Sequence, residues 1–458
     1  MTAMLQMPDL ERRSIVGTRL VVVLAGVLLA ACQPPAQPTI PPTPPAPGTP
    51  RETSSPTLGP RSPSREPGSP SPPATRNTSP SPTLGGGDGA WIYLADFPAE
   101  QAIEVASVTA WGGGFAAVGS EPAPDEGFGG RRNGVVWTSA DGRNWTRSLP
   151  SALGNATLTN VVLHGDSLFA FGEYSICPEF SEDDDCLDAP DAGVALWRSA
   201  DAVDWQRLAV PASLQAGILD GVVLGLGRLI AFGSTGEELV GALWLSADGQ
   251  SWEELRELGG VDPLSAVGAG PDRLVGFGTR YLPEEDDVET LAGYSTGGGF
   301  APAQLPAGQR GVIQAVLWSG TSYLAVGVEY EPAGEGLAPL ALTSADGSSW
   351  TAAASGDMPT NADFQQLLVL PSGYLVIGSV PSEEFGRELA YSWFSADGLV
   401  WQEHAALSGG AYRQLGGSAL GERGVVVFAT DFEESEEEPG TPVGGSIHAW
   451  FAPPESLP

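Results

Sequence analysis

The chain has 458 residues, and its 61 Gly and 41 Pro are about twice the usual share of these two residue types. All 21 basic residues are Arg, and together with 56 Asp and Glu they give a formal net charge of −35. A nucleic-acid-binding protein needs a basic face to neutralise phosphates, so this charge argues against that class. With only three Cys, the chain is neither a disulfide-rich scaffold nor a carrier of a Cys₄ zinc site.

Residues 1–31 are predicted to be a signal peptide. Three Arg precede an apolar run of 12 residues over 20–31, which is shorter than the roughly 20 residues of a membrane-spanning helix. The run ends in Leu29-Ala30-Ala31-Cys32, which resembles the lipobox of bacterial lipoproteins. The resemblance implies cleavage before Cys32 and lipidation of its sulfur, and therefore an extracytoplasmic lipoprotein anchored to the membrane of the cell envelope. The alternative is an ordinary signal peptide followed by an unrelated Cys.

Residues 32–85, which start at the expected lipidated Cys32, form a Pro/Ser/Thr-rich linker. Between residues 33 and 84, 18 of 52 residues are Pro, and very few are large and apolar. Such a segment cannot bury enough surface to offset its ordering entropy, so we expect it to be disordered. Pro-rich chains favour an extended conformation, and the expected role is a spacer between the membrane and the domain over 86–458.

Two sequence marks recur through this domain with the same period. One is a Ser-Ala-Asp string between apolar residues, closed by an aromatic residue at positions 145, 205, 252, 300, 350 and 401, where the copy at 294–300 is degenerate. The other is a short apolar segment ending in Gly, which recurs from Gly119 to Gly378 with a seventh copy ending at Ala429. Both marks repeat about every 50 residues, so they predict seven units.

Each unit has the pattern of four short strands bounded by Gly, Asp and Ser. Repeats of four strands over 40–50 residues are typical of β-propellers. The expected fold is therefore all-β, a seven-bladed β-propeller of four-stranded antiparallel blades. The last unit ends after a third strand, and residues 90–96 have the pattern of a fourth strand. We expect them to complete the seventh blade and so remove an exposed edge.

The Ser-x-Asp-Gly-x-x-Trp strings resemble the Asp-box, or BNR-like, repeat of sialidase-like propellers. This chain lacks one residue before the Trp compared with the usual repeat, and the resemblance covers residues 88–458. An Asp side chain accepts backbone N–H groups in a tight turn, and Gly tolerates a positive φ there. The expected structural turn residues, between the third and fourth strands, are Asp141, Asp201, Asp248, Asp346 and Asp397.

Acidic residues are concentrated in the loops between the second and third strands. Residues 86–458 contain 52 acids and 14 Arg, and 30 of the acids lie in these loops. The family resemblance implies that the loops emerge on one face, opposite the Asp turns. Such a face would attract a cationic protein, peptide or glycan through its negative potential. Alternatively, the acids only keep a monomeric domain soluble.

Cys177 and Cys186 flank an acidic run in the second unit, and outside the cytoplasm a disulfide between them is expected. Ca²⁺ is the alternative ligand of this loop, but the Asp-x-Asp-x-Asp-Gly spacing is absent, so no cofactor is expected. The three His, at 164, 404 and 448, fall in separate units, so no zinc site is expected.

A sialidase would need three Arg for the substrate carboxylate, a Tyr nucleophile paired with Glu, and an Asp acid. The Arg-Ile-Pro motif that usually supplies one of these Arg is absent, and sialidase catalytic domains usually have six blades. Six Arg could reach the acidic face, none of them in a recognisable motif: Arg131, Arg132, Arg280, Arg310, Arg387 and Arg413. We expect a non-catalytic binding or scaffold platform with no catalytic residues. The alternative is a sialidase-like glycoside hydrolase, and fold alone does not decide between the two.

Overall fold

The computed structural model describes residues 90–99, 104–123, 131–176, 192–236, 240–256, 258–261, 263–282, 287–296, 299–330, 337–353, 362–382, 387–434 and 442–458. The expected signal peptide over 1–31 and the linker over 32–85 with Cys32 lie outside the described residues. So do Cys177 and Cys186, together with many of the loop acids.

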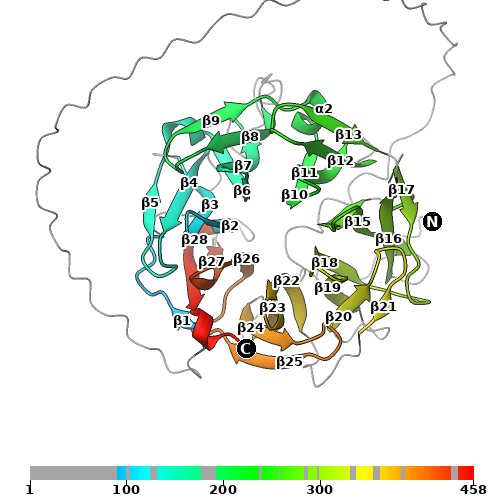
Figure 1. The fold of residues 1–458 in the computed structure, drawn as a ribbon. Helices are drawn as coiled ribbons and strands as arrows, with labels where there is room; N and C mark the ends of the chain where they lie inside the picture. Colours follow the sequence, from blue (N-terminus) through cyan, green and yellow to red (C-terminus); the bar gives the residue numbers. More distant parts are fainter. Residues whose placement is uncertain are drawn as a thin grey trace, which may run out of the picture. The chain divides into compact units, whose positions relative to one another are not determined.

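Seven four-stranded antiparallel sheets form a ring of blades, which confirms the predicted propeller (Figure 1). Within each blade the strands are called a to d from the centre of the ring outward. Blade 1 contains β2 (Glu104–Trp111), β3 (Gly114–Pro122), β4 (Arg132–Ser139) and β5 (Thr146–Ser148). Blade 2 contains β6 (Ala156–His164), β7 (Ser167–Tyr174), β8 (Gly193–Ser199) and β9 (Trp205–Leu208). Blade 3 contains β10 (Ile218–Gly225), β11 (Arg228–Thr235), β12 (Val240–Ser246) and β13 (Trp252–Leu255).

The next three blades repeat this order. Blade 4 contains β14 (Leu264–Ala269), β15 (Leu274–Leu282), β16 (Asp287–Thr296) and β17 (Gly299–Pro302). Blade 5 contains β18 (Val312–Trp318), β19 (Tyr323–Tyr330), β20 (Leu337–Ser344) and β21 (Thr351–Ala352). Blade 6 contains β22 (Asp363–Leu370), β23 (Gly373–Pro381), β24 (Glu388–Ser395) and β25 (Gln402–Ala406). The short helices are η2 (Ser151–Leu153), α2 (Ala212–Gln215) and η3 (Pro454–Ser456), and no helix in the described ranges is long and apolar enough to cross a membrane.

Blade 7 combines strands from both ends of the domain. Its strands are β26 (Gln414–Gly421), β27 (Gly424–Glu434), β28 (Pro442–Ala452) and β1 (Ile92–Tyr93). In the antiparallel pair, Ile92 lies opposite Phe451 and Tyr93 opposite Trp450. The backbone N–H of Leu94 extends this pairing by donating to the carbonyl of Ala449 at 2.8 Å. The fourth strand of blade 7 therefore comes from the N-terminal side of the propeller, and the ring is closed.

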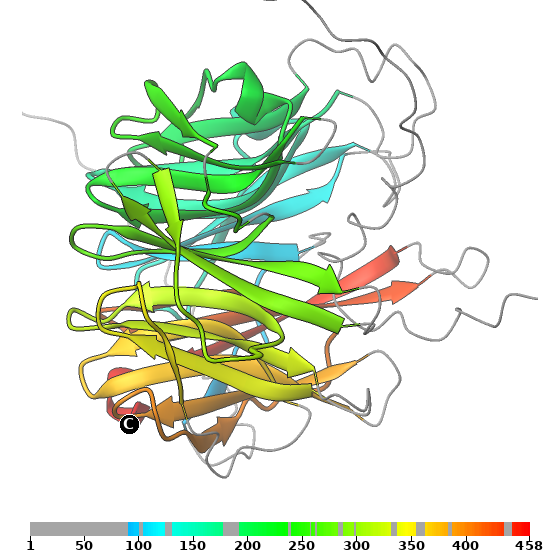
Figure 2. The ribbon, with the colours of Figure 1, turned by 90° about the vertical axis from the view of Figure 1, so that its right-hand side faces the viewer.

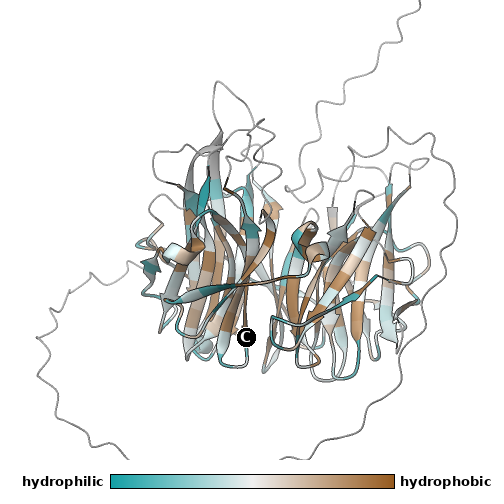
Figure 3. Ribbon diagram, turned by 90° about the horizontal axis from the view of Figure 1, so that it is seen from above, coloured by the Kyte–Doolittle hydropathy of each residue, from teal (hydrophilic) through white to brown (hydrophobic). Residues whose placement is uncertain are grey.

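Large aromatic side chains fill the spaces between blades. Five Trp on strand c are less than 2% exposed: Trp137, Trp197, Trp244, Trp393 and Trp450. Burying each one contributes about 1.5–3 kcal/mol. The indole N–H of Trp137 donates to the carbonyl of Pro98 at 2.8 Å, and that of Trp197 to the carbonyl of Ala152 at 3.1 Å. The same residues that form the core thus also fix the connections between blades. Figure 3 shows hydrophobic residues along the middle of the strands and hydrophilic ones at their ends.

The Gly that ends each apolar segment on strand b lies against the backbone of strand a. A Cβ at Gly119 would lie 1.9 Å from the carbonyl oxygen of Glu104, and one at Gly327 would lie 2.0 Å from that of Val312. Blade 7 has Ala429 at this position, and there the register of β26 skips two residues, between Leu415 and Ser418. The recurrent Gly therefore marks a close approach of two strands.

The connectivity gives the ring two different faces. The turns from strand a to b and from strand c to d lie on one face, called the turn face, which also carries the C-terminus (Figure 2). The ends of strands b and c that are joined by the acidic loops lie on the opposite face, called the loop face, together with the starts of the a strands.

Candidate functional site

The structure places the five Asp of the repeated strings in the turns between strands c and d, on the turn face. In blade 3, Asp248 Oδ1 accepts the backbone N–H groups of Gln250 at 2.8 Å and Ser251 at 2.7 Å. These hydrogen bonds from Ser251 and Gln250 lower the pKa of Asp248. The Ser246 hydroxyl oxygen accepts the N–H of Gly249 at 2.8 Å, and the same arrangement recurs at Asp141, Asp346 and Asp397. Each of these carboxylates therefore accepts backbone hydrogen bonds within its own turn.

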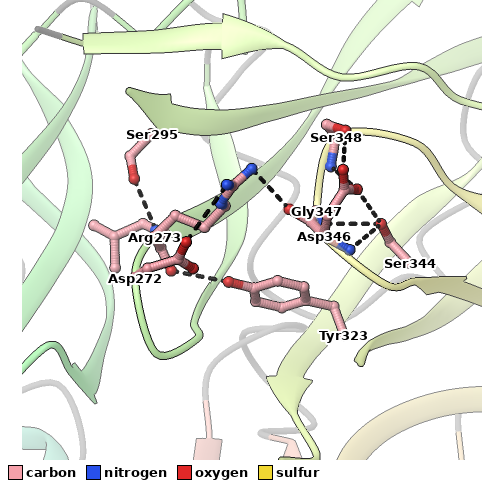
Figure 4. Close-up of polar contacts among 9 residues, drawn as sticks. Asp272, Arg273, Ser295, Tyr323, Ser344, Asp346, Gly347 and Ser348 are labelled. Carbon is pink, nitrogen blue, oxygen red and sulfur yellow. Dashed lines mark hydrogen bonds and ion pairs between the residues drawn. The ribbon is translucent and has the colours of Figure 1, made fainter. Parts of the chain in front are cut away.

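The Asp turns also lie against the preceding blade. Figure 4 shows this at Asp346, whose carbonyl oxygen accepts a hydrogen bond from Arg273 Nη1 at 3.1 Å. The hydroxyl of Tyr323 donates to the carbonyl of Arg273 at 2.9 Å. Burial is the largest cause that raises the pKa of Tyr323 to about 12, so this hydroxyl stays a donor at neutral pH. The turn residues thus form inter-blade contacts.

On the loop face, arginines pair with carboxylates. Arg387 Nη2 lies 3.1 Å from Asp431 Oδ2. Arg280 pairs with Glu289, Arg310 with Asp287, and Arg147 with the buried Glu121. Arg131, Arg132 and Arg413 also have interaction partners. Three of the six Arg considered for substrate binding, at 280, 310 and 387, are therefore held in ion pairs.

Every strand a contains a register irregularity near its loop-face end. In six blades the pairing with strand b skips one residue, and in blade 7 it skips two. The skipped residues are Ala106, Thr159, Asp220, Ser265, Gln314, Gln365 and the pair Gly416-Gly417. A β-bulge changes the direction of a side chain relative to the regular alternation of the strand. At two of the bulges the side chain donates to strand b of its own blade, Thr159 to the carbonyl of Phe171 at 3.5 Å and Ser265 to that of Phe277 at 3.3 Å.

In blades 5 and 6 the bulged side chains converge on Asp363, the first residue of β22. Gln314 Nε2 donates to Asp363 Oδ1 at 2.6 Å, and Gln365 Nε2 donates to Asp363 Oδ2 at 3.2 Å and to the Ser379 hydroxyl at 3.2 Å. Glu388, the first residue of β24, lies on the other side of Gln365 and Ser379. Asp363, Glu388, Gln314 and Gln365 are half-buried, whereas Ser379 is buried.

The two carboxylates share one environment. Burial is the largest cause that raises the pKa of Asp363 to about 7, and the negative charge of Glu388 raises it further. Burial also raises the pKa of Glu388. The charge of one carboxylate disfavours ionisation of the other. Near neutral pH Asp363 therefore keeps part of its proton.

Tyr412 joins the pair from blade 7. Its backbone N–H donates to the carbonyl of Glu388 at 2.9 Å, and the N–H of Glu388 donates to the carbonyl of Tyr412 at 2.7 Å. The side chain is fully buried, and burial followed by the charge of Glu388 raises its pKa well above the usual value. Ser379 lies beside its hydroxyl, but the hydroxyl has no well-formed hydrogen bond to any described residue. These residues, Asp363, Glu388, Tyr412, Gln314, Gln365 and Ser379, are called the acid cluster.

Sequence reasoning included Glu388 among the loop acids but did not find Asp363 or Tyr412. Two signals were present. Asp363 opens an apolar strand, and the polar pair Gln365-Gln366 follows after Phe364. Glu104 opens β2 in the same way, opposite Ser120, as Asp363 lies opposite Ser379. What the sequence alone could not supply is the contact between three blades.

The described residues show no group of three or more His, Cys, Asp or Glu arranged to hold a metal ion. The three His lie in different blades: His164 contacts the carbonyl of Ala247 at 2.8 Å, His404 lies on β25 in blade 6, and His448 stacks on Trp450 in blade 7.

No family model matches the sequence, and no curated protein does either. Solved propellers are similar in architecture. The β-propeller domain of the Trilobed protease from Pyrococcus furiosus aligns with a TM-score of 0.46 and 11% identity, over 76% of this chain and 93% of that one. Trypanosoma rangeli sialidase in complex with the inhibitor DANA aligns with a TM-score of 0.40 and 12% identity, over 77% of this chain and 55% of that one.

Zg3597, a family 117 glycoside hydrolase from Zobellia galactanivorans, aligns with a TM-score of 0.32 and 8% identity, over 79% of this chain and 90% of that one. These scores are all below 0.5. The similarity is therefore one of propeller architecture, and no function is transferred from it.

Proposed function

We propose that the protein is a non-catalytic, membrane-anchored extracytoplasmic β-propeller whose loop face binds a cationic partner. The observation that supports this most directly is the contrast between two kinds of carboxylate on that face. Glu121, Asp287, Glu289 and Asp431 each have an Arg partner. Asp363 and Glu388 share a site, and neither has an ion pair with a described basic residue. A negative site without its own cation favours a cationic ligand.

The test compares two fluorescent peptides of equal length, one rich in Lys and one rich in Glu, for binding to the purified full-length protein. We expect preferential binding of the Lys-rich peptide at about 20 mM salt and a clear loss of affinity at about 500 mM, where the Debye length is only a few ångströms. Equal binding of both peptides at both salt concentrations would contradict the proposal.

The alternative function, a sialidase-like hydrolase, has one observation in its favour. Tyr412 lies beside Glu388, and this pairing of residue types is the one that a sialidase nucleophile needs. Against it, three of the six candidate Arg are in ion pairs, and the Arg-Ile-Pro motif is absent from the sequence. An assay with fluorogenic sialosides and neutral glycosides separates the two functions. Turnover that is lost in both Y412F and R413A would establish the hydrolase.

The membrane anchor is tested separately, because it depends on the sequence alone. We expect the wild-type protein to incorporate labelled fatty acid and to fractionate with membranes, and C32A to lose both properties. Membrane retention and labelling of C32A would show that the lipobox-like string is not the site of attachment.

A further inference from the structure

We propose that the acid cluster is a binding site for a single primary ammonium group, either the side chain of a Lys on a protein partner or a free small amine. This inference deepens the proposed function, since it assigns a site and a chemical class to the cationic partner.

The charge of the site is not balanced within the described part of the chain. Burial is the largest cause that raises the pKa of Asp363 and of Glu388, and no described Arg lowers either one. Arg387, which precedes Glu388 in blade 6, pairs with Asp431 at 3.1 Å. The nearby amides of Gln314 and Gln365 are neutral donors. Placing two carboxylates together without a counter-charge is unfavourable, and a bound cation relieves this cost.

The remaining hydrogen-bonding capacity fits an ammonium group. Such a group has three N–H donors and no acceptor. The two carboxylates supply acceptor oxygens, and the buried hydroxyl of Tyr412, which has no well-formed partner, supplies a third acceptor beside them. A compact ammonium ion suits oxygens gathered from three side chains, whereas a planar guanidinium prefers a two-pronged contact with one carboxylate.

The site is reachable and held firmly. Asp363, Glu388, Gln314 and Gln365 keep partial exposure at the loop-face ends of their strands. The cluster is assembled from three blades, with Gln314 on β18, Asp363 on β22 and Tyr412 just before β26. The backbone exchange between Glu388 and Tyr412 ties blade 6 to blade 7 at this point. Groups fixed by three sheets are preorganised, which favours binding of a small charged group.

Binding of a cation here is coupled to protons. The titratable groups around Asp363 in the described elements are Glu388 on β24 and Tyr412 before β26, and β18 contributes only the neutral Gln314. A bound ammonium group favours the ionised form of both carboxylates, so the proton held at Asp363 leaves. Affinity should then rise about tenfold between pH 6 and pH 8, where the ammonium group itself stays charged.

The experiment uses isothermal titration calorimetry on the full-length protein. The probes are Nα-acetyl-lysine methylamide, its Nε-acetylated neutral counterpart, and a decapeptide with one central Lys. We expect the two ammonium probes to bind, the neutral one not to bind, and proton release near pH 7 in buffers of different ionisation enthalpy. D363N and E388Q should each reduce affinity at least tenfold, and Y412F should reduce it severalfold. E329Q is the matched control, because Glu329 is a half-buried loop-face carboxylate outside the cluster, and it should change little.

The outcomes separate this proposal from the proposed function. If the lysine probes bind and D363N and E388Q leave the affinity unchanged, the ammonium site is elsewhere on the loop face and the inference is wrong, while the proposed function stands. If the neutral probe binds as well as the charged one, recognition does not depend on charge and the inference also fails. Absence of binding by every Lys-containing probe, including the Lys-rich peptide, would overturn both. Preference for the small amine or for the decapeptide identifies the source of the ammonium group. The thermal unfolding curve of each variant shows that it is folded.

Discussion

The indole N–H of Trp91 donates to the hydroxyl of Ser392 at 3.0 Å across 301 residues of sequence. Trp91 immediately precedes β1, and Ser392 lies on β24 of blade 6. The hydroxyl of Ser392 in turn donates to the carbonyl of Ala405 at 3.0 Å. The N-terminal side of the propeller is therefore fixed both to its own blade, through β28, and to the neighbouring blade.

Trp91→Ala should destabilise the propeller by about 3–5 kcal/mol, because it leaves a cavity between blades 6 and 7 and removes the indole donor. Trp91→Phe keeps most of the packing and should cost about 1–2 kcal/mol. Chemical denaturation monitored by Trp fluorescence measures both. Equal stability of Trp91→Ala and the wild type would mean that residues before β1 do not help to close the ring.

Ala202→Gly should stabilise the protein by about 1 kcal/mol, because Ala202 has a φ of 60°, a conformation that suits Gly better than Ala. The equivalent residue in blade 3 is Gly249, with a φ of 74°. Gly249→Ala is the converse variant, and its Cβ would also lie 2.5 Å from the ring of Phe169. Thermal unfolding should show a higher midpoint for the first variant and a lower one for the second. If the unfolding midpoints of both variants moved in the same direction, the positive φ at this turn position would be contradicted.

Gly327→Ala should cost about 2–4 kcal/mol, because its Cβ would lie 2.0 Å from the carbonyl oxygen of Val312, so that strands a and b of blade 5 must separate. The natural control is Ala429 in blade 7, where the inner strand accommodates a side chain. Ala429→Gly should change stability by about 1 kcal/mol or less. Comparable losses in the two variants, measured by denaturant unfolding, would show that the recurrent Gly has no special steric role.

Asp363→Asn should stabilise the protein at pH 8 relative to the wild type and have little effect near pH 4. The pKa of Asp363 is raised in the folded state to about 7, from an ordinary value near 3.8, by burial and by Glu388. The contribution of a carboxyl group with a raised pKa is fully present below the unfolded pKa and is lost as the pH rises toward 7. The expected difference at pH 8 is about 1–3 kcal/mol. Unfolding curves at several pH values measure this difference. If the variant were more stable than the wild type at pH 4 but not at pH 8, the raised pKa of Asp363 would be contradicted.

Most of the fold could be predicted from the sequence because its determinants are local. The Asp turn needs only residues from Ser246 to Trp252, and the Gly mark reflects one contact between adjacent strands, as at Gly327. The Asp turn is present in five blades and the Gly in six, both with a spacing of about 50 residues, so the number of blades follows from that spacing. The acidic loops were also visible, but the pairing of Arg280, Arg310 and Arg387 with carboxylates was not.

The acid cluster could not be predicted because its members are different residue types at different positions of successive repeats. Gln314, Asp363 and Tyr412 come from consecutive blades, each about one repeat apart, yet they occupy different positions within the repeat. The bulges at Gln314 and Gln365 also interrupt the alternation of inward and outward side chains that a sequence pattern uses. The sequence shows that Gln314 and Gln365 are polar residues in apolar strands, but it does not show which side chains they contact.

The central claim is that Asp363, buried beside Glu388, keeps its proton up to about neutral pH. Its most direct test is infrared difference spectroscopy of the full-length protein titrated from pH 5 to pH 9. The account predicts a protonated-carboxyl band that disappears around neutral pH and is absent in Asp363→Asn. A spectrum in which all carboxyl groups are already ionised at pH 6, or in which the band persists in that variant, would contradict it.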